Sequence, residues 1–149
     1  MERLDKIKIA LEKGFTYDSI TGKIYNIKGR EIKCFNSRGY IVINISSNKK
    51  RFHLYGHQFA WYYVYNEIVD CIDHINQNKS DNRICNLRSV TQRQNTFNSN
   101  AKGYWYSNRD GVYYSSIWNN WNRIHLGSFK TEQEARQAYL DAKKIYHII

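Results

Sequence analysis

Asp73 and His74 stand side by side in a short apolar segment, and this pair could carry hydrolytic chemistry. Hydrolysis of a phosphodiester needs a base that activates water, and a neutral histidine can do this near neutral pH. It also needs a hard cation that neutralises charge on the phosphate, and such a cation prefers carboxylate and amide oxygens as ligands. Asp73 can supply one such oxygen, and Asn95 can supply another. These residue types fit metal-assisted hydrolysis of a phosphodiester bond.

The surrounding residues predict a strand, a polar turn, a second strand and a helix. We expect these elements at residues 72–75, 76–82 and 83–88, with the helix capped by Thr91 and carrying Asn95. Neighbouring residues on a strand point to opposite faces, so Asp73 could hold a metal while His74 addresses the water. The alternative without function is a polar hairpin in which Asp73 is a cap and His74 is satisfied in the turn.

This ordered set resembles the HNH (ββα-metal) endonucleases, in particular the branch found in phages and among homing endonucleases. The match consists of Asp73-His74, then Asn86-Leu87, then Asn95. The resemblance implies that His74 is the general base and that Asn86 braces the turn through backbone hydrogen bonds. It also implies that Asp73 and Asn95 bind one Mg²⁺ (or Mn²⁺) per active site. Products with a 3′-hydroxyl and a 5′-phosphate are what the resemblance implies.

The resemblance extends upstream of this motif, with two departures. Gln58 stands where the family commonly has Arg, and Asn76 stands where an acidic residue is common. Neither position touches the inferred chemistry, although Gln58 could mean a missing phosphate contact. The upstream match consists of Tyr25, Gly39-Tyr40, and His57 with Ala60-Trp61.

The other histidines and the cysteines have simpler interpretations. We expect His57 to be a packed structural residue on an aromatic helix over 57–65, and His53 to lie at the surface or face DNA. The three cysteines form no CxxC pair, so reduced thiols are expected and no structural zinc. Cys71 and Cys85 flank the hairpin, and we interpret them as small core residues.

The N-terminal part predicts a helix followed by short strands. Leu4, Ile7 and Leu11 share one face of a helix over 3–13. Alternating apolar residues over 40–45, the turn at 46–49 and the strand at 51–54 are typical of a β-hairpin. Two further short strands are expected at 15–17 and 23–26.

The C-terminal part predicts three strands and one helix after a polar linker at 96–103. The strands are expected at 103–106, 112–118 and 123–126. Thr131 and Glu134 form a capping box that begins the helix. The fold class is therefore α+β: a ββα-metal nuclease core with N-terminal strands, plus a small three-stranded antiparallel sheet backed by one helix.

The sequence HLGSFKTEQEARQAY, at 125–139, resembles the plant ethylene-response-factor type of DNA-binding domain. The resemblance covers roughly residues 101–146 and implies a sheet that lies in the major groove. Several arginines of the plant domains are here Trp105, Ser107 and Trp118, so the plant target sequence does not carry over. The alternative is that these aromatic residues cover the nuclease core. The positions expected to contact DNA are Lys102, Trp105, Ser107, Arg109, Ser116, Trp118, Arg123 and His125.

The formal net charge of the 149-residue chain is +10, which indicates a polyanionic partner. We expect a nuclease domain over 1–98, with its core at about 70–98, and a DNA-binding module over 99–149. The expected partner is double-stranded DNA, with no membrane contact, a cytoplasmic location and a monomer or weak dimer. Two rival functions are an inactive, sequence-specific DNA-binding regulator and a protein that binds or cleaves RNA.

Overall fold

The computed structural model describes residues 2–47 and 49–147, and the fold is α+β as predicted. The chain forms two compact units, Met1–Thr91 and Gln92–Ile149. The functional division expected after residue 98 stays a prediction. Within the described residues, no helix is long and apolar enough to cross a membrane.

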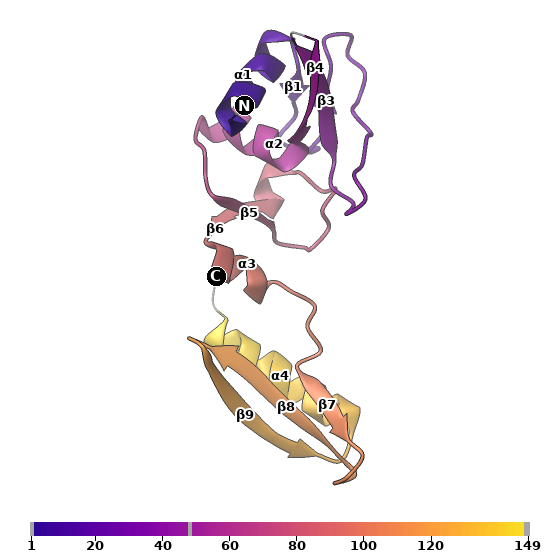
Figure 1. Cartoon of the computed structure of the whole chain (residues 1–149), viewed down its shortest axis with the longest axis vertical. Helices are drawn as coiled ribbons and strands as arrows, with labels where there is room; N and C mark the ends of the chain where they lie inside the picture. Colours follow the sequence, from indigo (N-terminus) through magenta and orange to yellow (C-terminus); the bar gives the residue numbers. More distant parts are fainter. Residues whose placement is uncertain (1, 48, 148–149) are drawn as a thin grey trace. The chain divides into compact units, whose positions relative to one another are not determined.

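The N-terminal unit combines two helices with three small antiparallel sheets, each made of two strands. Figure 1 shows these elements in indigo to pink. In chain order they are α1 (Arg3–Glu12), β1 (Thr16–Tyr17), β2 (Ile24–Tyr25), β3 (Val42–Ser47), β4 (Lys50–Tyr55), α2 (Gly56–Tyr65), β5 (Cys71–His74), the 3-10 helix η1 (Ile84–Asn86) and β6 (Leu87–Val90).

The core of this unit forms between α1, α2 and the β3–β4 hairpin. The hairpin pairs Ile43 with Leu54 and Ile45 with Phe52, so large buried side chains stand opposite each other on one face. Phe59 of α2 is fully buried in the same cluster. The strand alternation predicted for this hairpin is confirmed, and it builds the support beneath β5.

Two helix predictions need correction. In α1 the buried face runs through Ile7 and Ala10, at i and i+3, whereas Leu11 is exposed. In α2 only the first half is buried, and Tyr63 and Tyr65 are exposed. The aromatic composition of α2 suggested a buried helix, but full burial is limited to its first half, and Trp61 and Tyr62 are only partly buried against the core.

The hairpin of β5 and β6 is present as predicted, but its second strand begins later. Its register pairs Asp73 with Arg88 and His74 with Leu87. The prediction of a strand from residue 83 is wrong, because residues 84–86 form a 3-10 turn. Here the Asn86 side chain bonds to groups of the preceding turn, which competes with a strand ladder.

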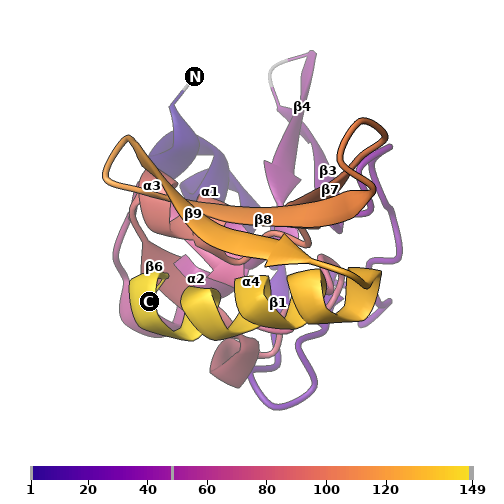
Figure 2. The same cartoon turned by 90° about the horizontal axis from the view of Figure 1, so that it is seen from below.

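The C-terminal unit contains a three-stranded antiparallel sheet backed by one helix, as predicted. The strand order is β7-β8-β9, and Figures 1 and 2 show α4 lying along one face of this sheet. Thr131 and Glu134 form the expected capping box. The core consists of Ile117, Tyr139 and Ala142, with Ile124 and Leu126 against it. The elements are α3 (Gln92–Phe97), β7 (Tyr104–Ser107), β8 (Val112–Asn119), β9 (Asn122–Phe129) and α4 (Glu132–Tyr146).

The predicted linker at 96–103 is instead anchored within this unit. Its first residues finish α3, and later carbonyl groups accept hydrogen bonds from α4. Lys143 Nζ donates to Ser99 O at 2.8 Å, and Arg136 Nη1 donates to Lys102 O at 2.8 Å. The segment takes part in these bonds through its backbone carbonyls, so its side-chain composition gave no sign of the anchoring.

Candidate functional site

Strand β5 carries Asp73 and His74 into the interior of the N-terminal unit. Asp73 is 7% exposed and His74 is 4% exposed. A buried carboxylate and a buried imidazole need polar partners, because burial without a hydrogen bond costs free energy. These partners come from β6 and from the turn that joins β5 to β6.

Asp73 is held by Arg88, its cross-strand neighbour. Arg88 donates from Nε at 2.9 Å and from Nη2 at 2.7 Å, both to Asp73 Oδ2. Charge-assisted hydrogen bonds of this kind are strong and fix the orientation of the carboxylate. Arg88 was not among the site residues predicted from the sequence. A correct prediction of the β5–β6 register would have identified Arg88, because that register places residue 88 opposite Asp73.

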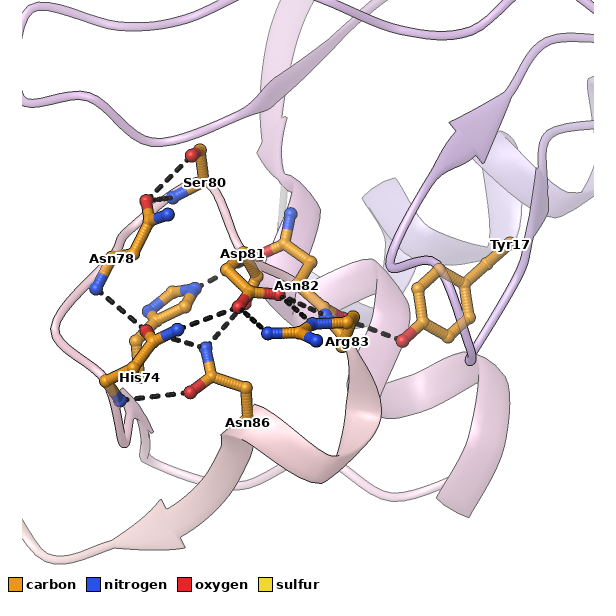
Figure 3. Close-up of polar contacts among 9 residues, drawn as sticks. Tyr17, His74, Asn78, Ser80, Asp81, Asn82, Arg83 and Asn86 are labelled. Carbon is orange, nitrogen blue, oxygen red and sulfur yellow. Dashed lines mark hydrogen bonds and ion pairs between the residues drawn. The ribbon is translucent and has the colours of Figure 1, made fainter.

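His74 is held by Asn82, which the sequence analysis also missed. His74 Nε2 lies 3.0 Å from Asn82 Oδ1, and Figure 3 shows the imidazole directed toward this amide. Burial lowers the pKa of His74, opposed by the Asn82 hydrogen bond and the charge of Asp73. A lowered pKa keeps the imidazole neutral near neutral pH, which is the form a general base requires.

Asn86 links the two ends of the turn between β5 and β6. Its Oδ1 accepts from Asn76 N at 3.0 Å, and its Nδ2 donates to Asn76 Oδ1 at 3.0 Å. The same Nδ2 donates to Asp81 O at 2.8 Å (Figure 3). The backbone also contributes, because Ile75 N donates to Asn86 O at 2.9 Å. These bonds are of the kind expected of a brace. The catalytic importance of Asn86 stays a prediction.

Asn76, a departure from the family pattern, takes part in a local polar network. Asn76 Nδ2 donates to Asp81 Oδ2 at 2.7 Å, and Arg83 forms an ion pair with the same carboxylate at 2.6 Å. The hydrogen bonds from Arg83, with help from Asn76, lower the pKa of Asp81 to about 2. Asp81 therefore stays ionised in this turn, where Arg83 balances its charge.

His57 lies against His74 within an aromatic cluster. The two imidazole centroids are 5.3 Å apart, and the ring of Tyr55 stacks on His57 at 5.3 Å. Burial, together with His74 and Arg3, lowers the pKa of His57 to about 3, so this side chain is neutral. Its Nδ1 is buried and has no hydrogen-bond partner among the described residues.

The expected metal ligands are Asp73 and Asn95. In this structure the Asp73 carboxylate is paired with the Arg88 guanidinium through Oδ2. Carboxylate and amide oxygens fit the ligand preference of Mg²⁺ or Mn²⁺. Asn95 lies on α3, in the C-terminal unit, and its pairing with Asp73 stays a prediction. Within residues 2–47 and 49–147, no three His, Cys, Asp or Glu side chains form a group that could hold a metal.

The cysteines flank the hairpin differently from what was expected. Cys71 is half-buried, as a small residue near the core would be, but Cys85 is exposed. The prediction of a core position for Cys85 is wrong. The reason is the 3-10 turn at 84–86, which buries Asn86 instead of its neighbour.

The open face of the C-terminal sheet carries most of the side chains expected to contact DNA. Ser115 and Ile117 of β8 are buried on the opposite face. Residues paired across antiparallel strands share a face. The cross-strand pairs on the open face are Trp105 with Tyr114, Ser116 with His125, and Trp118 with Arg123.

Two contacts within this open face hold the side chain of Arg123. The Arg123 guanidinium lies 4.4 Å from the ring centroid of Trp105, and its Nε donates to Ser116 Oγ at 3.0 Å. The rings of Tyr114 and His125 are 5.7 Å apart. Arginine stacked on an aromatic ring loses little further freedom when it binds a phosphate or a base.

The remaining predicted contact residues lie at the edge of the sheet. Ser107 and Arg109 both contact Asp110 in the β7–β8 turn, at 2.8 Å and 2.9 Å. Lys102 is exposed just before β7. The sequence analysis missed Trp121, whose side chain is 94% exposed in the β8–β9 turn, with φ of 69°.

Acidic residues of the C-terminal unit are concentrated on α4. Glu132, Glu134 and Asp141 belong to this helix, whereas Asp110 is the one acidic residue within 104–129. Asp110 is paired with Arg109. The sheet therefore carries little negative charge, whereas the acidic residues of α4 are matched by Arg136, Lys143 and Lys144.

Comparison with known proteins supports a nuclease assignment for one segment. Residues 55–97 match the model of the HNH endonuclease family. The matched segment ends before the C-terminal sheet, so the ethylene-response-factor type of module stays a prediction.

A solved structure of the HNH homing endonuclease I-HmuI, studied for DNA binding and cleavage, is 28% identical to the chain with a TM-score of 0.48. The match covers 56% of this chain and 50% of that one, so the chain spans about half the length of that neighbour. No curated protein matches the chain.

Proposed function

We propose that this protein is a metal-dependent DNA endonuclease with some site preference, of the homing or nicking type. The observation that carries the proposal is the buried His74, bound at one nitrogen by Asn82 and adjacent to Asp73, within a segment that matches HNH endonucleases. The net charge of +10 favours a nucleic acid as the substrate.

In the proposed reaction, His74 accepts a proton from the attacking water as that water adds to phosphorus. The P–O3′ bond breaks, which leaves a 3′-hydroxyl after protonation and a 5′-phosphate. Asn86 holds the turn that positions His74 and its partner Asn82. Asp73 and Asn95 would bind Mg²⁺ (or Mn²⁺), which when bound neutralises charge on the phosphate and the leaving oxygen.

Double-stranded DNA would be positioned by the open face of the C-terminal sheet. Its aromatic residues can contact sugars and thymine methyl groups, and Arg123 can bind a phosphate or a guanine. Trp121 extends this aromatic surface at the β8–β9 turn. Contacts of this type would give the nuclease its preference for particular sites.

The proposal is tested by incubating supercoiled plasmid with the full-length protein, with Mg²⁺ or with EDTA. We expect conversion to open-circular or linear DNA with Mg²⁺ and its loss with EDTA, because a hard cation supplies much of the charge neutralisation. Restoring excess Mg²⁺ should restore cleavage. Equal cleavage with EDTA would contradict the proposed metal dependence, and cleavage of structured RNA alone would assign the activity to RNA.

The DNA-binding face is tested by removing one positive charge from either side of the C-terminal unit. Arg123→Gln should weaken duplex affinity by roughly tenfold and reduce the salt dependence by about one phosphate contact. Lys144→Gln, on α4 and 73% exposed, removes the same charge and should leave affinity within about twofold. Fluorescence anisotropy at several salt concentrations measures both. Equal losses would mean that the sheet is not the contact face.

A further inference from the structure

We propose that Asn82 is a positioning residue that fixes the tautomer of His74, and that the N-terminal elements hold Asn82 in place. The inference rests on the proposed function of His74 as the base. It adds Asn82 and its supporting contacts to the four residues of the proposed site, which are Asp73, His74, Asn86 and Asn95.

The hydrogen bond to His74 defines which imidazole nitrogen carries the proton. A carbonyl oxygen can only accept, so Asn82 Oδ1 at 3.0 Å from Nε2 requires the proton on Nε2. Neutral His74 then has its lone pair on Nδ1, and that nitrogen accepts the proton of water. If the Asn82 amide were rotated by half a turn, its NH2 group would donate to Nε2, and the ring proton would sit on Nδ1. Nδ1 would then have no free lone pair with which to accept a proton from water.

Asn82 is fixed by contacts with two segments from the N-terminal half of the unit. Asn82 is 1% exposed, and Tyr17 Oη donates to its backbone carbonyl oxygen at 2.7 Å, as Figure 3 shows. Gly56, at the start of α2, lies so close that a Cβ there would be 2.8 Å from Asn82 Nδ2. These contacts come from β1 and from the start of α2.

A third contact fixes the backbone of the same residue. A Cβ on Gly22, in the turn between β1 and β2, would lie 2.8 Å from the Asn82 carbonyl carbon and 2.4 Å from Arg83 N. Gly22 also has φ of +73°, a conformation that glycine adopts without strain. The backbone of Asn82 therefore has little room to shift, and the amide keeps its position relative to His74.

The first test reads the tautomer directly, without metal and without DNA. Nitrogen-15 NMR of the full-length protein, at a pH well above the ordinary histidine pKa, distinguishes protonated from bare ring nitrogens. His74→Gln identifies the His74 signals among the five histidines. We expect a proton on Nε2 that is protected from exchange with water. A proton on Nδ1 would overturn the inference, whether or not the protein cleaves DNA.

The second test compares three substitutions in the turn. Asn82→Leu removes the acceptor at similar volume and should lower kcat by roughly 10- to 100-fold with little change in KM, as loss of a partner that orients a functional histidine does elsewhere. It should also abolish the protected Nε2 proton. Asn82→Asp retains an oxygen acceptor and should keep both the proton and most of the activity.

Asn78→Leu is the matched control. Asn78 is exposed in the same turn, and its side chain accepts from Ser80 N and Oγ, so this variant should match the wild type in kcat and in the His74 signals. If Asn82→Leu kept wild-type kcat and the protected proton, the inference would be wrong. If Asn82→Leu does not fold, Asn82→Asp and the wild-type spectrum decide, because an Nδ1 proton in either one contradicts the proposal.

An inactive wild type with the Nε2 proton in place would count against the proposed function. The tautomer inference would survive that result, because its first test uses neither substrate nor cation. An active wild type with the proton on Nδ1 would overturn the tautomer inference and leave the proposed function standing. The two proposals therefore fail on different measurements.

Discussion

His74→Ala should lower the rate of plasmid cleavage by roughly 100-fold or more, while duplex affinity stays within a few-fold of the wild type. The imidazole is the proposed proton acceptor, and alanine leaves water with no base at that position. DNA affinity should survive because His74 is 4% exposed and has little surface to offer a ligand. Conversion of supercoiled plasmid measures the rate, and fluorescence anisotropy measures the affinity.

His53→Ala is the control for this experiment. His53 is an exposed histidine on β4 that contacts Asn44, and its removal should leave the cleavage rate unchanged. Wild-type cleavage by His74→Ala would show that another group is the base. If the wild type binds duplex DNA but neither protein cuts any substrate, the chain is a DNA-binding regulator. Preferential binding to structured RNA in competition would favour the RNA alternative.

Gly103→Ala should destabilise the C-terminal unit by about 3 kcal/mol or more and abolish its DNA binding. A Cβ at this position would lie 2.0 Å from a ring carbon of Tyr139, and Gly103 has φ of +74°. Tyr139 is one of the three buried residues of this small core, so it has no room to move. Urea unfolding followed by tryptophan fluorescence measures the change in the free energy of unfolding. Three of the four tryptophans lie in this unit, and Trp61 lies in the other.

Gly111→Ala separates the steric effect from the backbone effect. Gly111 has φ of +68°, but a Cβ there would meet nothing within 4 Å. This variant should therefore lose only about 1 kcal/mol, the cost of a left-handed conformation in alanine. Equal losses in the two variants would contradict close packing of Gly103 on Tyr139. Unchanged duplex affinity in an unfolded C-terminal unit would rule out the sheet as the DNA-binding face.

Much of the fold could be predicted because its signals are local. Alternation over residues 40–45 located the β3–β4 hairpin, although β3 continues through Ser46 and Ser47, where a turn was predicted. The Thr131 capping box located the start of α4. The start of β6 could not be predicted, because Asn86 belongs to a side-chain network that only the folded turn assembles. The anchored segment at 99–103 also escaped, since its partners lie more than 30 residues away, on α4.

Only part of the candidate site could be predicted. The order of Asp73, His74 and Asn86 can be read from the chain, and the structure places all three on β5 or at its turn. Arg88 and Asn82 became visible only through the strand register and the burial of the turn. Asparagine is so common in this chain that no local pattern distinguishes Asn82 from its neighbours.

The hydrogen bond from Tyr17 to Asn82 joins residues 65 positions apart. Contacts between distant residues form late in folding, because closing a long loop costs chain entropy before the contact is gained. The β5–β6 hairpin can pair from local contacts, but the histidine partner is held in place only after the N-terminal segment has packed against the turn. A partly folded or partly unfolded chain would therefore carry the nuclease motif without an oriented base. Under the proposed function, this dependence would confine DNA cleavage to the completely folded protein.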